Sequence, residues 1–160
     1  MGAPHTQAWY KHTQGHNGIL VDQKGQLYDA GAFGFLPRFI RGKSLSYAVG
    51  DASHAYQAHE LSLKARKDNT PNDMEVDVFK RHYILLKPNI FVVYDELESK
   101  SPVDWSWLIH NYDGLKLNSE NKTVETTYKD RGGKVTLFGS TDLDYSCLLY
   151  TSPSPRDTRE

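Results

Sequence analysis

The sequence contains very little cysteine, no long apolar run and almost no net charge. A single Cys in 160 residues excludes an internal disulfide and any metal cluster built on several thiolates. No apolar run approaches the roughly 18–20 residues that span a bilayer, and the opening MGAPHTQAWYKH lacks the apolar core of a signal peptide. Nineteen basic residues balance twenty acidic ones, so the net charge of −1 predicts no nucleic-acid and no membrane partner.

Helical periodicity is nearly absent as well. Apolar and polar residues instead alternate with period two in short runs that are rich in β-branched and aromatic residues. The predicted strands cover residues 8–12, 18–22, 33–41, 45–49, 60–66, 76–86, 90–96, 103–111, 123–128 and 134–139. Residues 87–89, 119–122 and 130–133 are typical of hairpin turns. Many strands without helices predict an all-β fold, an antiparallel β-sandwich, although an open barrel has the same periodicity.

The chain changes character near its end, in the stretch YSCLLYTSPSPRDTRE. Ser, Pro, Thr and charged residues replace the alternation that is typical of strands. We therefore expect a β-sandwich domain over residues 1–146 and a disordered tail over residues 147–160. The segment CLLYTSPSPRD resembles the translated read-through of a sequencing adapter, which implies that the tail and Cys147 are not native.

Aromatic residues reach 12%, and five of the seven His precede residue 60. This composition favours a carbohydrate ligand, because sugar faces stack on aromatic rings while sugar hydroxyls need polar partners. The densest cluster is His5, Trp9, Tyr10, His12, His16, Asn17 and Asp22. On an extended chain His12 and His16 would lie about 13 Å apart, too far for both to bind one ion at ~2.0–2.1 Å. An alternative is that these residues only pack and form hydrogen bonds on a sheet surface.

Four segments, in order, resemble a known family. Trp9-Tyr10, Thr13, His16-Asn17 and the following ILVDQKGQ resemble the opening of the C-terminal sandwich in heparinase II/III-like polysaccharide lyases. YAVGDASHAY, the stretch from Arg81 to KPN with FVVYD after it, and WLIH resemble later segments of that sandwich. The resemblance covers roughly residues 4–112, and Gln23 departs from the Gly usual in the family.

The resemblance implies a sandwich fragment, truncated at one or both ends, of an enzyme that also has an N-terminal α-barrel. The parent would cleave a uronate-containing glycan, alginate- or heparin-like, by β-elimination, in which a base removes the C5 proton and an acid protonates the leaving oxygen. Its partners would be the acidic polysaccharide and the missing barrel of the same protein. We expect a periplasmic or secreted parent, and an inactive fragment.

The resemblance also implies roles for individual residues. His16 would be a zinc ligand whose companions lie outside this chain, and the zinc would order the region beside the cleft. Trp9, Tyr10 and Asn17 would bind substrate; no residue stands out as catalytic, and Tyr10 and His12 are the nearest candidates. Asp51 and Tyr56 are interpreted as structural. The alternative function is a non-catalytic sandwich that binds carbohydrate or another protein without zinc.

Overall fold

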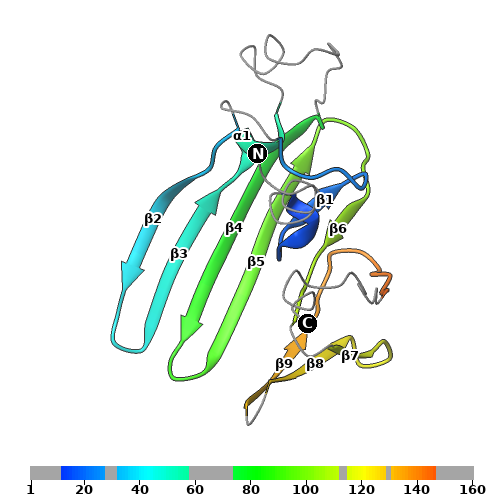
Figure 1. The fold of residues 1–160 in the computed structure, drawn as a ribbon. Coiled ribbons are helices and arrows are strands. Elements are labelled where there is room, and N and C mark those ends of the chain that lie inside the picture. The colour runs from blue at the N-terminus through cyan, green and yellow to red at the C-terminus, as the bar shows by residue number, and fades with distance from the viewer. Residues whose placement is uncertain (1–11, 28–31, 58–73, 112–114, 129–130, 147–160) are drawn as a thin grey trace, which may run out of the picture. The chain divides into compact units, whose positions relative to one another are not determined.

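The computed structural model describes residues 12–27, 32–57, 74–111, 115–128 and 131–146, and its strands form three antiparallel sheets (Figure 1). The chain divides into two compact units, Met1–Leu108 and Ile109–Glu160. Two of the predicted substrate-binding residues, Trp9 and Tyr10, lie outside the described residues, as do His5, the predicted strand 60–66 and the tail 147–160.

The first unit is built around a sheet with the strand order β2-β3-β4-β5. Its strands are β2 (Phe35–Arg41), β3 (Leu45–Asp51), β4 (Val76–Leu86) and β5 (Ile90–Ser99). Strands β4 and β5 pair from Leu86↔Ile90 to Val76↔Ser99. The predicted Lys87-Pro88-Asn89 turn is confirmed. Its physical reason is that Pro presets a turn and cannot donate a hydrogen bond to a strand ladder.

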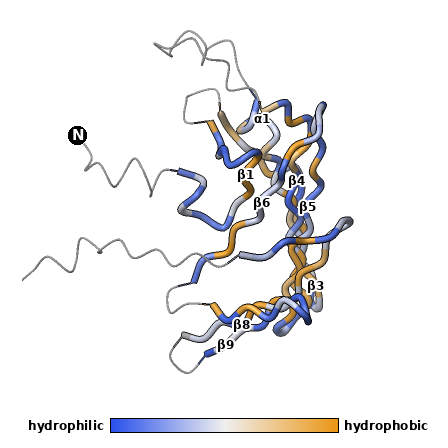
Figure 2. The backbone as a smooth tube through the Cα atoms, turned by 90° about the vertical axis from the view of Figure 1, so that its right-hand side faces the viewer, coloured by the Kyte–Doolittle hydropathy of each residue, from blue (hydrophilic) through white to orange (hydrophobic). Residues whose placement is uncertain are grey.

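A two-stranded ribbon covers part of this sheet. Strand β1 (Ile19–Val21) pairs with β6 (Trp105–Trp107), and the short helix α1 (Ser53–Tyr56) follows β3. Residues from these elements and from β4 form one buried cluster: Ile19, Val21, Leu27, Ala55, Tyr56, Met74, Val76 and Phe79. The ribbon, helix and large sheet therefore share a core, with hydrophobic residues recurring along β1 and the long strands (Figure 2).

The second unit contains a three-stranded sheet, β7-β8-β9. Strands β7 (Leu115–Asn118), β8 (Thr123–Tyr128) and β9 (Arg131–Thr136) pair consecutively. The predicted turn at 119–122 is confirmed. The predicted turn at 130–133 is wrong from Arg131 onward, because Arg131, Gly132 and Gly133 pair with β8 inside the ladder; Asp130 lies outside the described residues.

Several other boundaries also differ from prediction. The strand predicted at 103–111 is only Trp105–Trp107, the length over which it pairs with β1, and His12 belongs to a turn, not a strand. Strand β9 ends at Thr136 before the predicted Gly139, and β7 and α1 were not predicted. Every strand pair in the described residues is antiparallel, and the chain is all-β with a sandwich architecture. No helix among the described residues is both long and apolar enough to cross a membrane.

Candidate functional site

The segment that carries His16 and Asn17 is a tight turn ahead of β1. A 3-10 helix, η2 (Thr13–Gly15), begins after His12, whose Nδ1 accepts a hydrogen bond from the Gln14 backbone N–H at 3.2 Å. At its end the His16 N–H donates to the Thr13 carbonyl at 3.0 Å. His12 therefore caps the turn. Because the chain from His12 to His16 is not extended, the separation expected for an extended chain does not apply to them.

Buried Thr13 anchors this turn to the loop after β1. Its Oγ1 accepts a hydrogen bond from the Gln26 N–H at 2.7 Å. Gly25 lies so close that a Cβ there would be 2.6 Å from the Oγ1 and Cβ of Thr13. Only glycine fits this approach, so Gly25 is required by packing, and not by a positive φ.

The reversal after β1 is a two-residue hairpin. Asp22 and Gln23 have φ values of 48° and 63°, and Val21 and Lys24 exchange backbone hydrogen bonds. The Asp22 carboxylate accepts a hydrogen bond from the Asp104 N–H at 2.9 Å. Gln23, like Asp22, therefore adopts the left-handed conformation that favours Gly.

Arg81 connects the turn to the large sheet. Its Nε and Nη2 donate to the two carboxylate oxygens of Asp95 at 2.7 and 2.8 Å, and Nη1 donates to the Asn17 carbonyl at 2.7 Å. Both side chains of the ion pair are only 11% exposed. Burial opposes the charged form of Arg81, but Asp95 outweighs it and the pKa of Arg81 is raised. The bidentate pair orients Arg81, and its third hydrogen bond fixes the Asn17–Gly18 peptide against β4.

These elements surround a hollow of about 660 Å³ in the first unit. Polar residues of its lining come from the turn, the following loop and the sheet: Thr13, His16, Asn17, Gln26, Asp51, Arg81 and Tyr83. Phe35, Leu36, Leu27 and Phe79 supply apolar surface. Gly50 also lines the hollow, and a Cβ there would meet nothing within 4 Å. A space with several hydrogen-bonding groups and aromatic walls suits a small polar ligand with apolar faces, such as a sugar.

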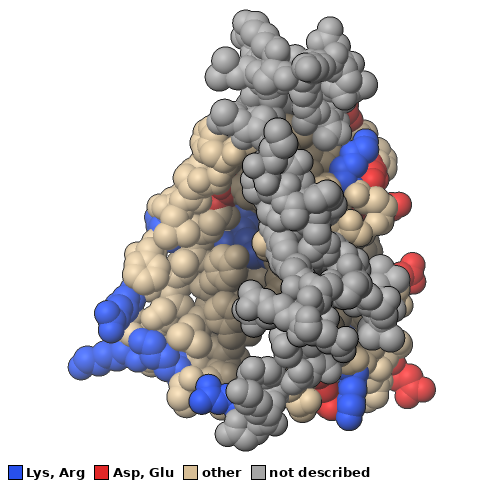
Figure 3. Space-filling model, in the orientation of Figure 1, with Lys and Arg blue, Asp and Glu red and all other residues tan. Residues whose placement is uncertain are grey.

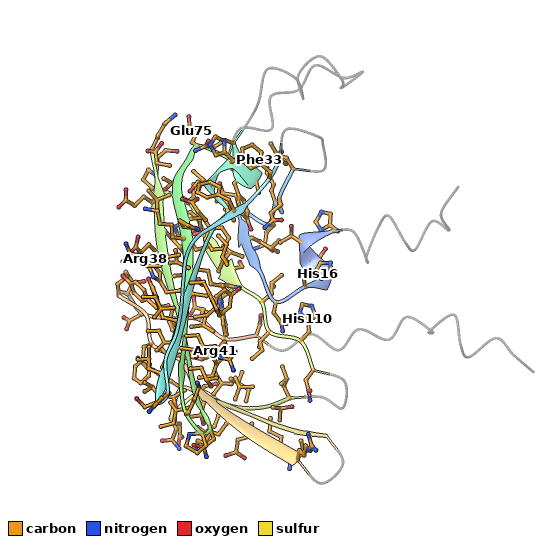
Figure 4. The ribbon with its side chains drawn as sticks, turned by 90° about the vertical axis from the view of Figure 1, so that its left-hand side faces the viewer. His16, Phe33, Arg38, Arg41, Glu75 and His110 are labelled. Carbon is orange, nitrogen blue, oxygen red and sulfur yellow. The ribbon has the colours of Figure 1, made fainter. Side chains whose placement is uncertain are left out.

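The structure brings together only some of the predicted site residues. His16, labelled in Figure 4, is exposed. It lines the hollow together with Asn17, whereas His12 is not part of the lining. Sequence reasoning did not assign Arg81, Tyr83 or Phe35 to the site. Arg81 had a detectable signal, since a hairpin turn at 87–89 places it opposite Asp95.

The predicted structural roles of Asp51 and Tyr56 fit their contacts. Asp51 Oδ1 accepts hydrogen bonds from the N–H and hydroxyl of Ser53, and this hydroxyl accepts one from the Phe79 N–H. The Tyr56 hydroxyl donates to the Ile19 carbonyl at 2.6 Å inside the core. Both residues therefore tie α1 to neighbouring strands.

Another polar group lies on the opposite face of the sheet. The Tyr47 hydroxyl is 2.7 Å from His82 Nδ1, and His82 Nε2 is 3.2 Å from Glu96. Strand pairing places His82 opposite Val49 and Arg81 opposite Gly50, so consecutive residues of β4 point to different faces. The Tyr47–His82 pair is thus not part of the hollow.

The residues around the hollow do not form a complete zinc site by themselves. The described ranges contain no group of three His, Cys, Asp or Glu side chains arranged to hold a metal ion. Asp51, the carboxylate in the lining, is already engaged by Ser53. The assignment of His16 as one zinc ligand remains a prediction that requires ligands from elsewhere.

Sequence comparisons identify no relative of the chain. No protein family and no curated protein matches the chain. The contacts around the hollow therefore carry the functional argument.

Proposed function

We propose that this chain forms the sheet side of the substrate cleft in a heparinase II/III-like polysaccharide lyase. The protein would cleave a uronate-containing glycan, alginate- or heparin-like, by β-elimination. The observation that carries the proposal is that His16 and Asn17, singled out by the sequence pattern, line one hollow together with Arg81, Tyr83 and Phe35.

The hollow suits the recognition of a uronate more than its chemical conversion. Asn17 and Gln26, which carry side-chain amides, line the hollow together with Phe35. Amides hydrogen-bond sugar hydroxyls and carboxylates, and an aromatic ring packs against a sugar face. In β-elimination a base removes the C5 proton, a C4–C5 double bond forms, and the C4–oxygen bond breaks as an acid protonates that oxygen. Donors that stabilise the carboxylate as charge develops on it make this proton easier to remove.

We assign the acid and base to another part of the protein. Among the described residues of the hollow, Asp51 is hydrogen-bonded to Ser53, and Arg81 is paired with Asp95. Zinc, when bound through His16 and ligands supplied elsewhere, would order the turn beside the cleft. The chain alone should therefore bind uronate oligomers without cleaving them.

Gly50 offers a direct test of the binding site. Because a Cβ at Gly50 meets nothing within 4 Å, Gly50→Phe should place its ring in the hollow. It should weaken binding of a size-defined polymannuronate tetrasaccharide at least tenfold in calorimetric titration. Gly50→Ala, which keeps most of the space, should bind nearly as well as wild type and report on folding. Unchanged affinity in a folded Gly50→Phe variant would exclude the hollow as the binding site.

A non-catalytic carbohydrate-binding or interaction module is the second candidate, because the polar and aromatic lining of the hollow could hold a sugar without a metal. Zinc analysis of the longer protein, with and without His16→Ala, separates the two. Loss of zinc together with loss of unsaturated products supports the lyase. Glycan binding that persists without any metal supports the module.

A further inference from the structure

The hollow is continued by an aromatic strip on the same sheet. A second hollow of about 170 Å³ is lined by Phe39, Ala48, Tyr83, Leu85 and Phe91, with Ser46 and Tyr47. Tyr83 lines both hollows, so they adjoin at its side chain.

Strand register places the aromatic side chains of the strip on one face. Phe39 pairs with Ala48, Ala48 with Tyr83, and Leu85 with Phe91; direct partners in antiparallel strands share a face. The rings of Tyr83 and Phe91 are stacked with centroids 6.0 Å apart. Phe39 is 64% exposed and Phe91 59% exposed. The strip therefore presents aromatic surface to solvent next to the candidate site.

The part of the sheet that carries this strip is also basic. Residues 32–50 and 81–94 include Arg38, Arg41, Lys43, Arg81 and Lys87 but no Asp or Glu. The two hairpin turns touch, because the Lys87 N–H donates to the Ser44 carbonyl at 2.9 Å and Lys87 Nζ donates to the Gly42 carbonyl at 2.5 Å. Basic side chains accordingly gather at the lower left of Figure 3, where the β2–β3 and β4–β5 turns lie.

Arg41 lies on the same face as the strip. It pairs with Ser46, two residues from the Phe39–Ala48 pair, whereas Arg38 pairs with Val49 on the other face. In Figure 4 Arg41 lies on the side of the sheet that carries His16, and Arg38 on the other side. A cation at the end of an aromatic strip matches a ligand that has apolar ring faces and repeated negative charge.

We propose that the strip Phe39–Tyr83–Phe91, with Arg41 at its end, binds further sugar units of an acidic glycan whose first units occupy the larger hollow. This inference rests on the proposed function. The basic end of the sheet favours an anionic glycan over an apolar protein partner, because a buried protein interface would leave these cations desolvated and without acidic partners.

The test compares short and long polymannuronate oligomers on the full 160-residue chain. Phe39→Ala and Phe91→Ala should each weaken binding of the octasaccharide about three- to tenfold, and should leave disaccharide binding unchanged. Tyr94→Ala is the matched aromatic control, since Tyr94 is similarly exposed but pairs with His82 on the opposite face. Arg41→Gln should weaken octasaccharide binding more at low salt than at high salt, and Arg38→Gln should not.

The outcomes separate the strip from the proposed function. If wild type and the Phe39→Ala and Phe91→Ala variants bind the octasaccharide equally well, the strip does not bind sugar and the inference is wrong. If Gly50→Phe nevertheless loses disaccharide binding, the hollow is still supported as the binding site. If all of these variants bind both oligosaccharides as wild type does, the inference about the strip and the proposed binding site in the hollow are both wrong. If sedimentation shows that wild type is dimeric and that the two Phe variants are monomeric with unchanged glycan affinity, the strip is a protein interface and the inference is wrong.

Discussion

The two ends of the large sheet use similar residues in opposite ways. At one end Val76 is 1% exposed and packs with Tyr56 and Phe79 beneath the ribbon and α1. At the hairpin end of the same β4–β5 pair, Ile90 is 57% exposed. Both are β-branched residues in long antiparallel strands, so their burial depends on which elements cover the sheet, and strand propensity does not decide it.

Polar groups are also buried at one end of the sheet and exposed at the other. At the covered end, buried polar atoms have defined partners, as in the Arg81–Asp95 pair and the Ser53 hydroxyl between Asp51 and the Phe79 N–H. At the hairpin end, the cations Arg41 and Lys43 are solvent-exposed. Substitutions at the covered end should therefore change stability, whereas those at the hairpin end should change ligand binding.

The largest expected effect is at the ion pair. Asp95→Ala leaves the Arg81 guanidinium desolvated without its carboxylate, and should lower the free energy of unfolding by about 3–5 kcal/mol. Lys87→Ala, at the exposed hairpin end, should cost less than about 1 kcal/mol. Urea unfolding of both variants measures the two decreases in the free energy of unfolding. Equal decreases would contradict the expected difference between the covered end and the hairpin end of the sheet.

A smaller effect on stability is expected from substitution of Gly25, which is tightly packed, compared with Gly50, which faces open space. Gly25→Ala places a Cβ 2.6 Å from Thr13, and the displacement should cost about 1–3 kcal/mol. Gly50→Ala meets nothing within 4 Å, so its stability should change by less than about 1 kcal/mol. Thermal unfolding of the pair measures the difference, and a Gly25→Ala variant as stable as wild type would show that the Thr13 contact relaxes freely.

Tyr56 links the covered end to pH. Tyr56→Phe leaves the buried Ile19 carbonyl without its donor and should cost about 1–2 kcal/mol near neutral pH. Burial raises the pKa of Tyr56 from 10.0 to about 12. The unfolded chain therefore loses this proton first, and stability from this group is complete below pH 10 and falls as pH rises towards 12.

The stability gap between wild type and Tyr56→Phe should accordingly narrow over that alkaline range. Denaturant unfolding of both proteins at a series of pH values measures the gap. A gap that stays constant, or widens, would contradict the assignment of the shift to this buried phenol.

The smallest expected effect is a gain. Gln23→Gly relieves a left-handed φ but removes the exposed hydrogen bond of 3.3 Å from Gln23 Nε2 to Ser106 Oγ. It should therefore raise the free energy of unfolding by less than about 1 kcal/mol, since the added chain entropy also offsets part of the relief. Asp22→Gly is the matched variant at the neighbouring left-handed position. It should give no such gain, because it removes the shorter hydrogen bond that the Asp22 carboxylate accepts from the Asp104 N–H at 2.9 Å.

Local pattern was sufficient for much of the fold. The bounds of β4 and β8 were predicted from their runs of β-branched and aromatic residues, and the β4–β5 hairpin follows from Lys87-Pro88-Asn89. Strand β9 was misplaced because Gly132 and Gly133 are typical of turns, yet here they pair in a ladder with β8. At the site, His16 and Asn17 were found from a contiguous motif, whereas Tyr83 and Phe35 come from distant strands that only folding brings to the hollow.

The sequence by itself determined that the chain is all-β, where its longest strands run, and that Arg81 and Asp95 face each other across a hairpin, because these features depend on local alternation and one turn. Only the tertiary structure decided which apolar residues are buried and that the His16-Asn17 turn, Arg81 and Phe35 share a hollow. The reason is that burial and cleft formation depend on contacts between segments far apart in the chain, and period-two alternation identifies a face without showing what covers it.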